Sequence, residues 1–130
     1  MVTYTINTPA FDMIDITNQV HEAVRESGVE EGCALVYCPH TTAAITINEN
    51  ADPDVVRDLK LAWGDIFGDR RDFRHAEGNS AAHLKSSAIG ASELVPISSY
   101  ALALGAWQGI YFCEFDGPRT RRFHVQVMSA

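Results

Sequence analysis

Short segments rich in β-branched and aromatic residues recur along most of this chain, and Pro, Gly, Asn or Asp separates many of them. This pattern is typical of strands joined by turns. A sheet of such strands needs helices or a second sheet to cover its apolar face. The sequence therefore predicts an α+β fold, mainly an antiparallel sheet or sandwich with two or three helices. The expected strands cover residues 2–7, 12–16, 33–38, 43–47, 83–89, 93–97, 108–115 and 119–128.

The residues between these segments predict how the strands are connected. The break at Thr8-Pro9 favours a hairpin of the first two strands, and Pro39-His40 is expected to join two adjacent strands. Asp116-Gly117-Pro118 predicts the last turn. The polar segment from Gly68 to Ser80 is long for a simple connection. We expect it to be a functional loop.

Two segments have helical spacing and recognisable ends. The first is expected to be capped by Thr17, to bury a face that includes Val20, and to stop at Gly28. The second is expected to start at Asp52, because Asp accepts bonds from free N–H groups and Pro53 is preorganised for the first helical position.

Composition limits the class of protein. A length of 130 residues with 46% hydrophobic residues fits one domain spanning residues 1–130. The net charge of −7, from 17 acidic and 10 basic residues, disfavours nucleic acid and anionic membrane as partners. The three cysteines are odd in number and form no C-x-x-C motif. With no apparent leader or membrane segment, we expect a cytoplasmic protein.

Three histidines lie where a scaffold would present reactive groups. His40 follows an apolar strand, and His75 and His83 bracket the end of the polar loop. Three imidazoles with one open position form a typical catalytic metal site, and they suit zinc, nickel, copper or iron. The alternative is that each is an ordinary hydrogen-bonded or surface histidine. His21 and His124 are expected to be structural, because one lies on a helix face and the other in an alternating strand.

A polar stretch between a strand and the second helix holds further candidates. Asn48 and Glu49 open this stretch, and Asp52 within it is explained by capping. Glu49 is left without a local partner in sequence. It is a candidate general base or a partner that orients an imidazole, with a simple solvated role as the alternative.

Arginines near the C-terminus are candidates for anion binding. Arg119 follows a rigid turn, and its guanidinium is suited to phosphate. Arg121 would share its strand face, and Arg122 would lie on the other. The alternative is an edge strand protected by charge.

Other side chains are weaker candidates. Lys85, Ser86 and Ser87 would add phosphate contacts or merely alternate outward on a strand. Cys113 looks buried, and neither it nor Cys38 has a neighbouring cation in sequence that would activate a thiol.

Three long blocks of sequence carry a family resemblance. The blocks His40–Asp54, His75–Ser87 and Leu104–Arg119 resemble the YjbQ-like family, UPF0047, also called the secondary thiamine-phosphate synthase family. The resemblance implies a compact homotrimer with sites near subunit contacts. It also implies a metal held by His40, His75 and His83 in anion-binding surroundings. We expect that cofactor to be a divalent metal, in the first place zinc.

The family activity implied by this resemblance is the coupling of a pyrimidine methyl diphosphate to a thiazole phosphate with release of diphosphate. In this transferase hypothesis Arg119 and the metal neutralise the leaving group, while Glu49 or His40 moves a proton. Asn48 and Asn79, with Lys85, Ser86 and Ser87, are the other expected contacts to a small phosphorylated metabolite. The alternatives are a non-catalytic protein that binds a metal or a phosphorylated metabolite, and a metal-assisted hydrolase.

Overall fold

The computed structural model describes all 130 residues, which form eight strands and three helices. In chain order they are β1 (Val2–Thr8), β2 (Asp12–Asp15), α1 (Thr17–Ser27), β3 (Gly32–Tyr37), β4 (Ala43–Glu49), α2 (Pro53–Ile66), α3 (Ser80–Ile89), β5 (Ser92–Ser98), β6 (Ala101–Leu102), β7 (Gln108–Glu114) and β8 (Arg119–Ser129). None of the three helices combines the length and the apolar character that crossing a membrane requires.

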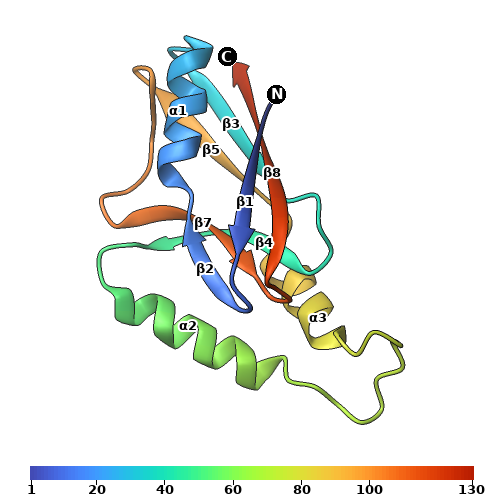
Figure 1. Cartoon of the computed structure of the whole chain (residues 1–130). Coiled ribbons are helices and arrows are strands. Elements are labelled where there is room, and N and C mark those ends of the chain that lie inside the picture. Colours follow the sequence, from blue (N-terminus) through green and yellow to red (C-terminus); the bar gives the residue numbers. More distant parts are fainter.

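The strands form two antiparallel sheets that lie across one another (Figure 1). One sheet has five strands in the order β1-β8-β3-β5-β6, and the other has three in the order β2-β7-β4. Helix α1 packs against the five-stranded sheet, α2 runs beside β2, and α3 lies against β4. The prediction of a mainly antiparallel α+β fold is confirmed.

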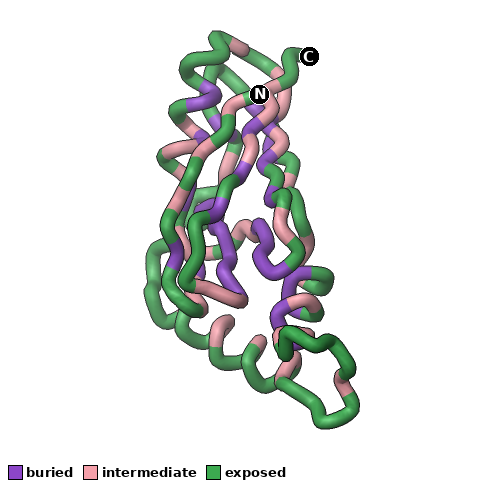
Figure 2. Tube along the Cα trace, turned by 45° about the vertical axis from the view of Figure 1, so that its right-hand side comes forward, coloured by how far each residue is buried: buried purple, intermediate pink, exposed green.

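Strand β7 separates two apolar cores, which is why it is buried along almost its whole length (Figure 2). Ile110 and Phe112 face the larger core, between the sheets and α1. Tyr111 and Cys113 face the smaller one, toward α2 and α3. Because successive side chains in a strand point to opposite faces, one strand serves both cores. Phe112 lies close to Phe123 of β8, with ring centroids 6.2 Å apart, and this contact ties the two sheets together.

The prediction of a strand at residues 83–89 is wrong, because this segment lies in helix α3. The buried residues Ala81, Ala82, Lys85 and Ser86 recur at helical spacing. Alanine also has the highest helix propensity, so it outweighs the apparent alternation. The helix ends at Gly90, whose φ of 107° few other residues adopt.

Two predicted strand pairings are also wrong. Strands β1 and β2 form no hairpin: β1 pairs with β8 and β2 with β7, in different sheets. Likewise β3 and β4 are not neighbours, because β3 lies between β8 and β5 while β4 pairs with β7. In both cases the Pro-containing connection carries the chain from one sheet to the other.

The helix ends follow the sequence with one exception. Asp52 caps α2 by accepting a hydrogen bond from the backbone N–H of Asp54 at 2.9 Å, and Gly28 ends α1 in the left-handed conformation. Thr17 does not cap α1 as expected, because Ile16 occupies that position. Instead, the Asp15 carboxylate accepts from both the N–H and the hydroxyl of Thr17.

Candidate functional site

A polar cavity of about 380 Å³ lies where the β3–β4 connection, the start of α3 and the start of β8 meet. Every lining residue except Pro39 is polar or charged. The lining residues are Pro39, His40, Thr41, Thr42, His75, Glu77, Asn79, His83, Arg119 and Arg121. The three expected histidines and the expected arginine therefore line one cavity, although they come from distant parts of the sequence.

His40 is held by the backbone of β8. The β3–β8 register pairs Tyr37 with His124, so Pro39 falls opposite Arg122 and cannot donate a ladder hydrogen bond. The His40 imidazole takes that place, with Nε2 lying 2.9 Å from the Arg122 nitrogen and 3.1 Å from its carbonyl oxygen. Burial, and then the charge of Arg121, lowers the pKa of His40. His40 is therefore neutral at neutral pH.

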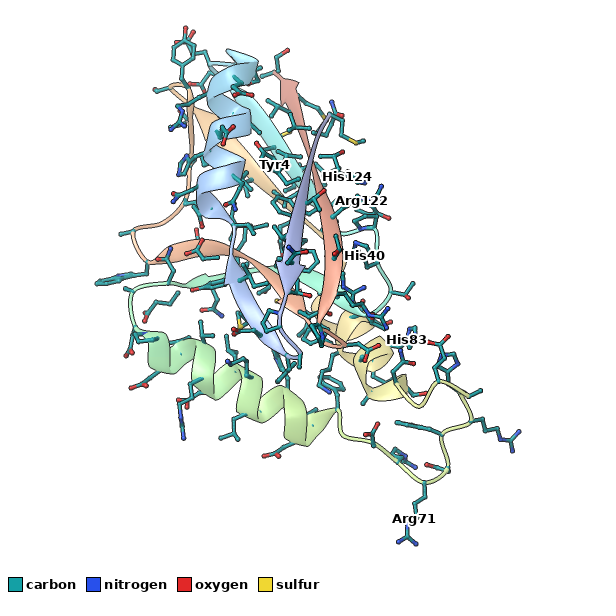
Figure 3. All side chains as sticks on the ribbon, viewed as in Figure 1. Tyr4, His40, Arg71, His83, Arg122 and His124 are labelled. Atoms are coloured by element: carbon teal, nitrogen blue, oxygen red, sulfur yellow. The ribbon has the colours of Figure 1, made fainter.

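His75 and His83 form a pair across the opening of the loop. Their ring centroids lie 5.2 Å apart and the rings are nearly perpendicular. His83 projects from the first turns of α3, near His40, whereas Arg71 extends from the loop tip into solvent (Figure 3). The loop thus brings His75 to the helix, while its tip at Arg71 points away from the cavity.

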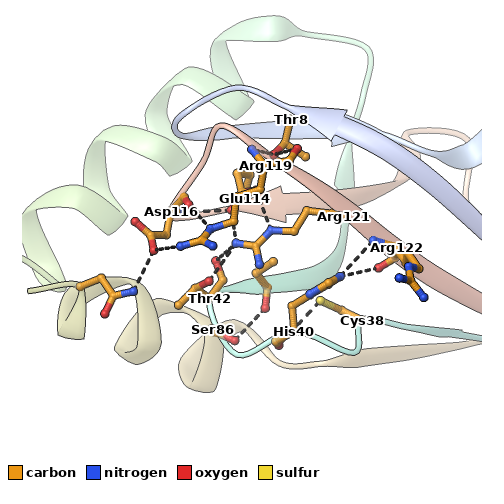
Figure 4. A network of polar contacts seen from close by, with 12 residues as sticks. Thr8, Cys38, His40, Thr42, Ser86, Glu114, Asp116, Arg119, Arg121 and Arg122 are labelled. Atoms are coloured by element: carbon orange, nitrogen blue, oxygen red, sulfur yellow. Dashed lines mark hydrogen bonds and ion pairs between the residues drawn. The ribbon is translucent and has the colours of Figure 1, made fainter. Parts of the chain in front are cut away.

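A buried ion pair forms the base of the cavity (Figure 4). Arg121 donates from Nε and Nη2 to the two oxygens of Glu114, at 2.7 Å and 2.6 Å, and the two side chains are 5% and 0% exposed. Thr8 and the backbone N–H of Asp116 also donate to Glu114, and Arg121 donates to Thr42. Burial alone would raise the pKa of Glu114, but these hydrogen bonds hold that pKa below its ordinary value.

Arg119 is fixed in a similar way nearer the surface. Its Nε donates to the Asp116 carbonyl at 2.7 Å and its Nη2 to the Asp116 carboxylate at 2.9 Å. Asn79 donates to the same carboxylate at 2.8 Å. The hydrogen bonds from Asn79 and Arg119 lower the pKa of Asp116. This arrangement leaves the buried Oδ1 of Asn79 without a hydrogen-bond partner at the cavity wall.

Other expected site residues lie elsewhere in the chain. Asn48 and Glu49 are at the far end of β4 from His40, roughly 20 Å away at the ~3.3 Å rise of a strand. Lys85 is buried, donates to the Phe67 carbonyl at the end of α2, and faces the Phe11 ring. Burial also lowers its pKa. Lys85 is therefore placed to tie α3 to α2 and not to contact an anion in this cavity.

The two serines belong to a neighbouring depression. Ser86 and Ser87 line this second cavity together with His40 and His83. The Ser86 hydroxyl is already committed to the Ala43 carbonyl at 2.7 Å, whereas Ser87 is exposed.

The cysteines are placed as expected. Burial raises the pKa of the Cys38 thiol to about 11 and raises that of Cys113 as well. Both thiols are therefore protonated at neutral pH and are poor nucleophiles.

The expected three-imidazole metal centre is not assembled in this structure. No group of three or more His, Cys, Asp and Glu side chains lies close enough together to hold a metal ion. His75 and His83 are near enough to act as a pair, but the Nε2 of His40 is turned toward Arg122. A third imidazole ligand would therefore have to come from Nδ1 of His40.

Sequence patterns alone did not identify Glu114, Asp116 and Thr42 as parts of the site. A usable signal was present, because Glu114 and Arg121 are opposite charges on the apolar faces of strands joined by the 116–118 turn. Two opposite charges that are both buried, and that lie so near one another in the sequence, are expected to form an ion pair.

A family model and curated relatives of this chain all point to the same protein family. The family model "UPF0047 protein YjbQ-like" matches residues 2–130. UPF0047 protein YugU of Bacillus subtilis is 54% identical over 118 residues, covering 90% of this chain and 89% of YugU. UPF0047 protein MJ1081 of Methanocaldococcus jannaschii is 48% identical over 117 residues, covering 90% and 85% of the two chains.

Solved structures agree with these sequence relatives. The crystal structure of a YjbQ/UPF0047 family protein from Clostridium acetobutylicum matches with a TM-score of 0.96 and 52% identity, covering 98% of this chain and 100% of that one. A YbjQ-like protein of unknown function from Sulfolobus solfataricus matches with a TM-score of 0.94 and 31% identity, covering 99% and 96%. The chain belongs to the YjbQ-like UPF0047 family.

Proposed function

We propose that this chain is a transferase of the thiamine-phosphate synthase type. It would couple a pyrimidine methyl diphosphate to a thiazole phosphate and release diphosphate. The observation that carries the proposal is the polar cavity, in which two fixed guanidinium groups meet three imidazoles. Departing phosphate oxygens gain negative charge, and preorganised cations stabilise that charge best where water is restricted.

The two arginines are oriented for an anion. Arg119 and Arg121 each use Nε and Nη2 on an acidic residue of the chain, and neither Nη1 makes a hydrogen bond within it. Each guanidinium therefore keeps donors for a ligand while its carboxylate partner fixes its direction. Arg121 is almost fully buried and its charge is paired with Glu114, so it offers an oriented hydrogen-bond donor more than net positive charge.

His40 is suited to moving a proton. When its Nε2 accepts from the Arg122 N–H, Nδ1 carries the proton and can give it away. When Nε2 donates to the Arg122 carbonyl, Nδ1 is the free base. The backbone thus offers a partner to either neutral tautomer. We assign the proton transfer to Nδ1 of His40, because Glu49 lies at the other end of β4.

A divalent metal, in the first place zinc, is part of the proposal. His75 and His83 would hold it, and when bound it would polarise a phosphate oxygen, while Nδ1 of His40 stays free for the proton. Metal analysis of the purified protein tests this directly. We expect near-stoichiometric zinc that is lost in folded His75→Ala and His83→Ala variants, and unchanged metal content in both would refute the assignment.

Assembly is proposed as a homotrimer. Helix α2 contains no buried residue, and large apolar side chains such as Leu61, Ile66 and Trp107 are exposed nearby. Burial of such surface favours association. Asn48 and Glu49 would then reach a site only in a neighbouring subunit. Light scattering at micromolar concentration should give three times the chain mass, and a monomer would refute the proposal.

Diphosphate binding tests the anion site, with a matched control on the same strand. Arg119→Ala should weaken binding of inorganic diphosphate about tenfold or more, because a hydrogen bond to a charged group contributes about 1.5–3 kcal/mol. Arg122→Ala removes the same charge from the opposite face of β8 and should leave affinity within about twofold. Equal effects of the two variants would reduce the site to general surface charge.

Product analysis separates the transferase from its alternatives. With both substrates present, the transferase releases diphosphate and forms a product that joins the two rings. Diphosphate or phosphate released from the pyrimidine substrate alone would indicate a hydrolase. Tight binding without any product would indicate a binding protein, and either result would overturn the proposal.

A further inference from the structure

A second cavity, of about 590 Å³, adjoins the polar cavity and shares a wall with it. His40 and His83 line both, together with Pro39 and Thr41. Along α3, His83, Ser87 and Gly90 fall at positions i, i+4 and i+7, so one face of the helix lines this cavity. The two cavities therefore adjoin between α3 and the β3–β4 connection, with the imidazoles between them, and together they are called the groove.

The chemistry of the two halves differs. The first half holds Arg119, Arg121 and Glu77, whereas no Lys, Arg, Asp or Glu lines the second. Several backbone groups of the second half are already paired, as in the hydrogen bond from Cys38 N–H to the Ala91 carbonyl at 2.8 Å. A charged group would meet no opposite charge among the side chains there, so an uncharged group suits this half better.

Aromatic surfaces give the second half its selectivity. Tyr37 is 43% exposed as a residue, and its ring lies nearly parallel to the His124 ring, at 12° with centroids 6.3 Å apart. His124 therefore holds Tyr37 in place from the neighbouring strand. Tyr37, His40 and His83 all line the cavity, so three flat rings border it. Offset stacking of flat rings on such surfaces is favourable.

We propose that this second cavity binds an uncharged aromatic ring of a substrate whose phosphate occupies the histidine–arginine cavity. The inference rests on the proposed anion site and adds the place where the ring of the phosphorylated substrate binds, beside Tyr37. The second cavity alone, at about 590 Å³, falls within the usual size range of small-molecule sites, roughly 300–1,000 Å³. The shared wall places His40 and His83 beside the bond that joins ring and phosphate.

Calorimetric titration with two probes tests this assignment. Inorganic phosphate reports the anion site alone, and phenyl phosphate reports both halves. We expect the wild type to bind phenyl phosphate at least tenfold more tightly than inorganic phosphate. Tyr37→Ala should remove most of that difference while leaving the affinity for inorganic phosphate within about twofold. Tyr100→Ala, which removes a tyrosine of comparable exposure far from the groove, should change neither.

The outcomes separate this inference from the proposed function. If inorganic phosphate binds but phenyl phosphate binds no more tightly, the ring site is wrong and the anion site stands. The ring site is also wrong if Tyr37→Ala and Tyr100→Ala behave alike in a folded protein. If neither probe binds, the anion site fails, and the ring site fails with it.

Discussion

Replacing Glu114 with glutamine should be among the most damaging single changes in the fold. Both carboxylate oxygens accept two hydrogen bonds each: one takes those of Thr8 and Arg121 Nε, and the other those of Arg121 Nη2 and the Asp116 N–H. Glutamine keeps the shape but turns one acceptor into a donor. Whichever way the amide lies, its NH₂ group meets two donors, and Arg121 loses its counter-charge.

The expected loss follows from this burial. Breaking a buried ion pair by removing one charge costs about 3–5 kcal/mol. A domain of this size has a free energy of unfolding of about 5–15 kcal/mol, so the melting temperature should fall by roughly 10–20 °C. Urea unfolding followed by circular dichroism measures the loss directly. Asp58→Asn is the control, because the Arg57–Asp58 pair is 71% exposed on both sides and should change stability by no more than about 0.5 kcal/mol.

A double substitution sharpens the test. Glu114→Leu combined with Arg121→Met removes both charges, so no uncompensated ion remains in the interior. The double variant should lose clearly less stability than the sum of the two single variants. Additive losses, or a Glu114→Gln variant no less stable than Asp58→Asn, would refute the assignment of this pair as a coupled buried network.

Lys85→Met should lower stability by about 1–2 kcal/mol in urea unfolding, by leaving the Phe67 carbonyl unpaired, while diphosphate affinity stays unchanged. A loss of diphosphate affinity in the folded variant would show that Lys85 contributes to the anion site after all. Gly32→Ala should destabilise by about 1–3 kcal/mol because its Cβ would collide with the Met128 backbone, whereas Gly64→Ala has open space on α2 and should stabilise by up to about 1 kcal/mol. The same sign for both in thermal melts would contradict this reading. Asp116, whose pKa is lowered by its hydrogen bonds, contributes stability that is complete above the ordinary carboxyl range and is lost as pH falls through the lowered pKa. Unfolding curves between pH 7 and 3 should therefore fall less steeply with acid for Asp116→Asn than for wild type, and parallel curves would exclude this contribution.

Local patterns predicted the elements well and their pairing poorly. Seven of the eight expected strands lie close to observed ones, because β-branched runs and turn residues act locally. The missed strand β6 has only two residues. Pairing depends on which apolar faces meet in the core, and β1 pairs with β8 across more than a hundred residues. The hairpin expected at Thr8-Pro9 failed for that reason.

In the candidate site, too, local patterns predicted individual residues but not the contacts that depend on how distant elements pack. His40, His75 and His83 were identified because strand ends and loops present reactive side chains. All three line the polar cavity. Alternation along β8 also put Arg119 and Arg121 on one face. No local pattern predicts that Lys85 is buried, since that depends on α3 packing against the end of α2. The position of Glu49 likewise depends on the direction of β4.

The buried ion pair also links the stability of the fold to the proton on His40. After burial itself, the charge of Arg121 lowers the pKa of His40, while Glu114 acts in the opposite direction. Removing the Glu114 charge should therefore lower the pKa of His40 further below that of the wild type. An NMR titration of the His40 ring in Glu114→Gln, at a temperature where the variant is folded, measures this shift, and Asp58→Asn should show none. An unchanged or raised pKa would mean that the charge of Glu114 does not act on the imidazole, and the proposed link between this ion pair and His40 would then be refuted.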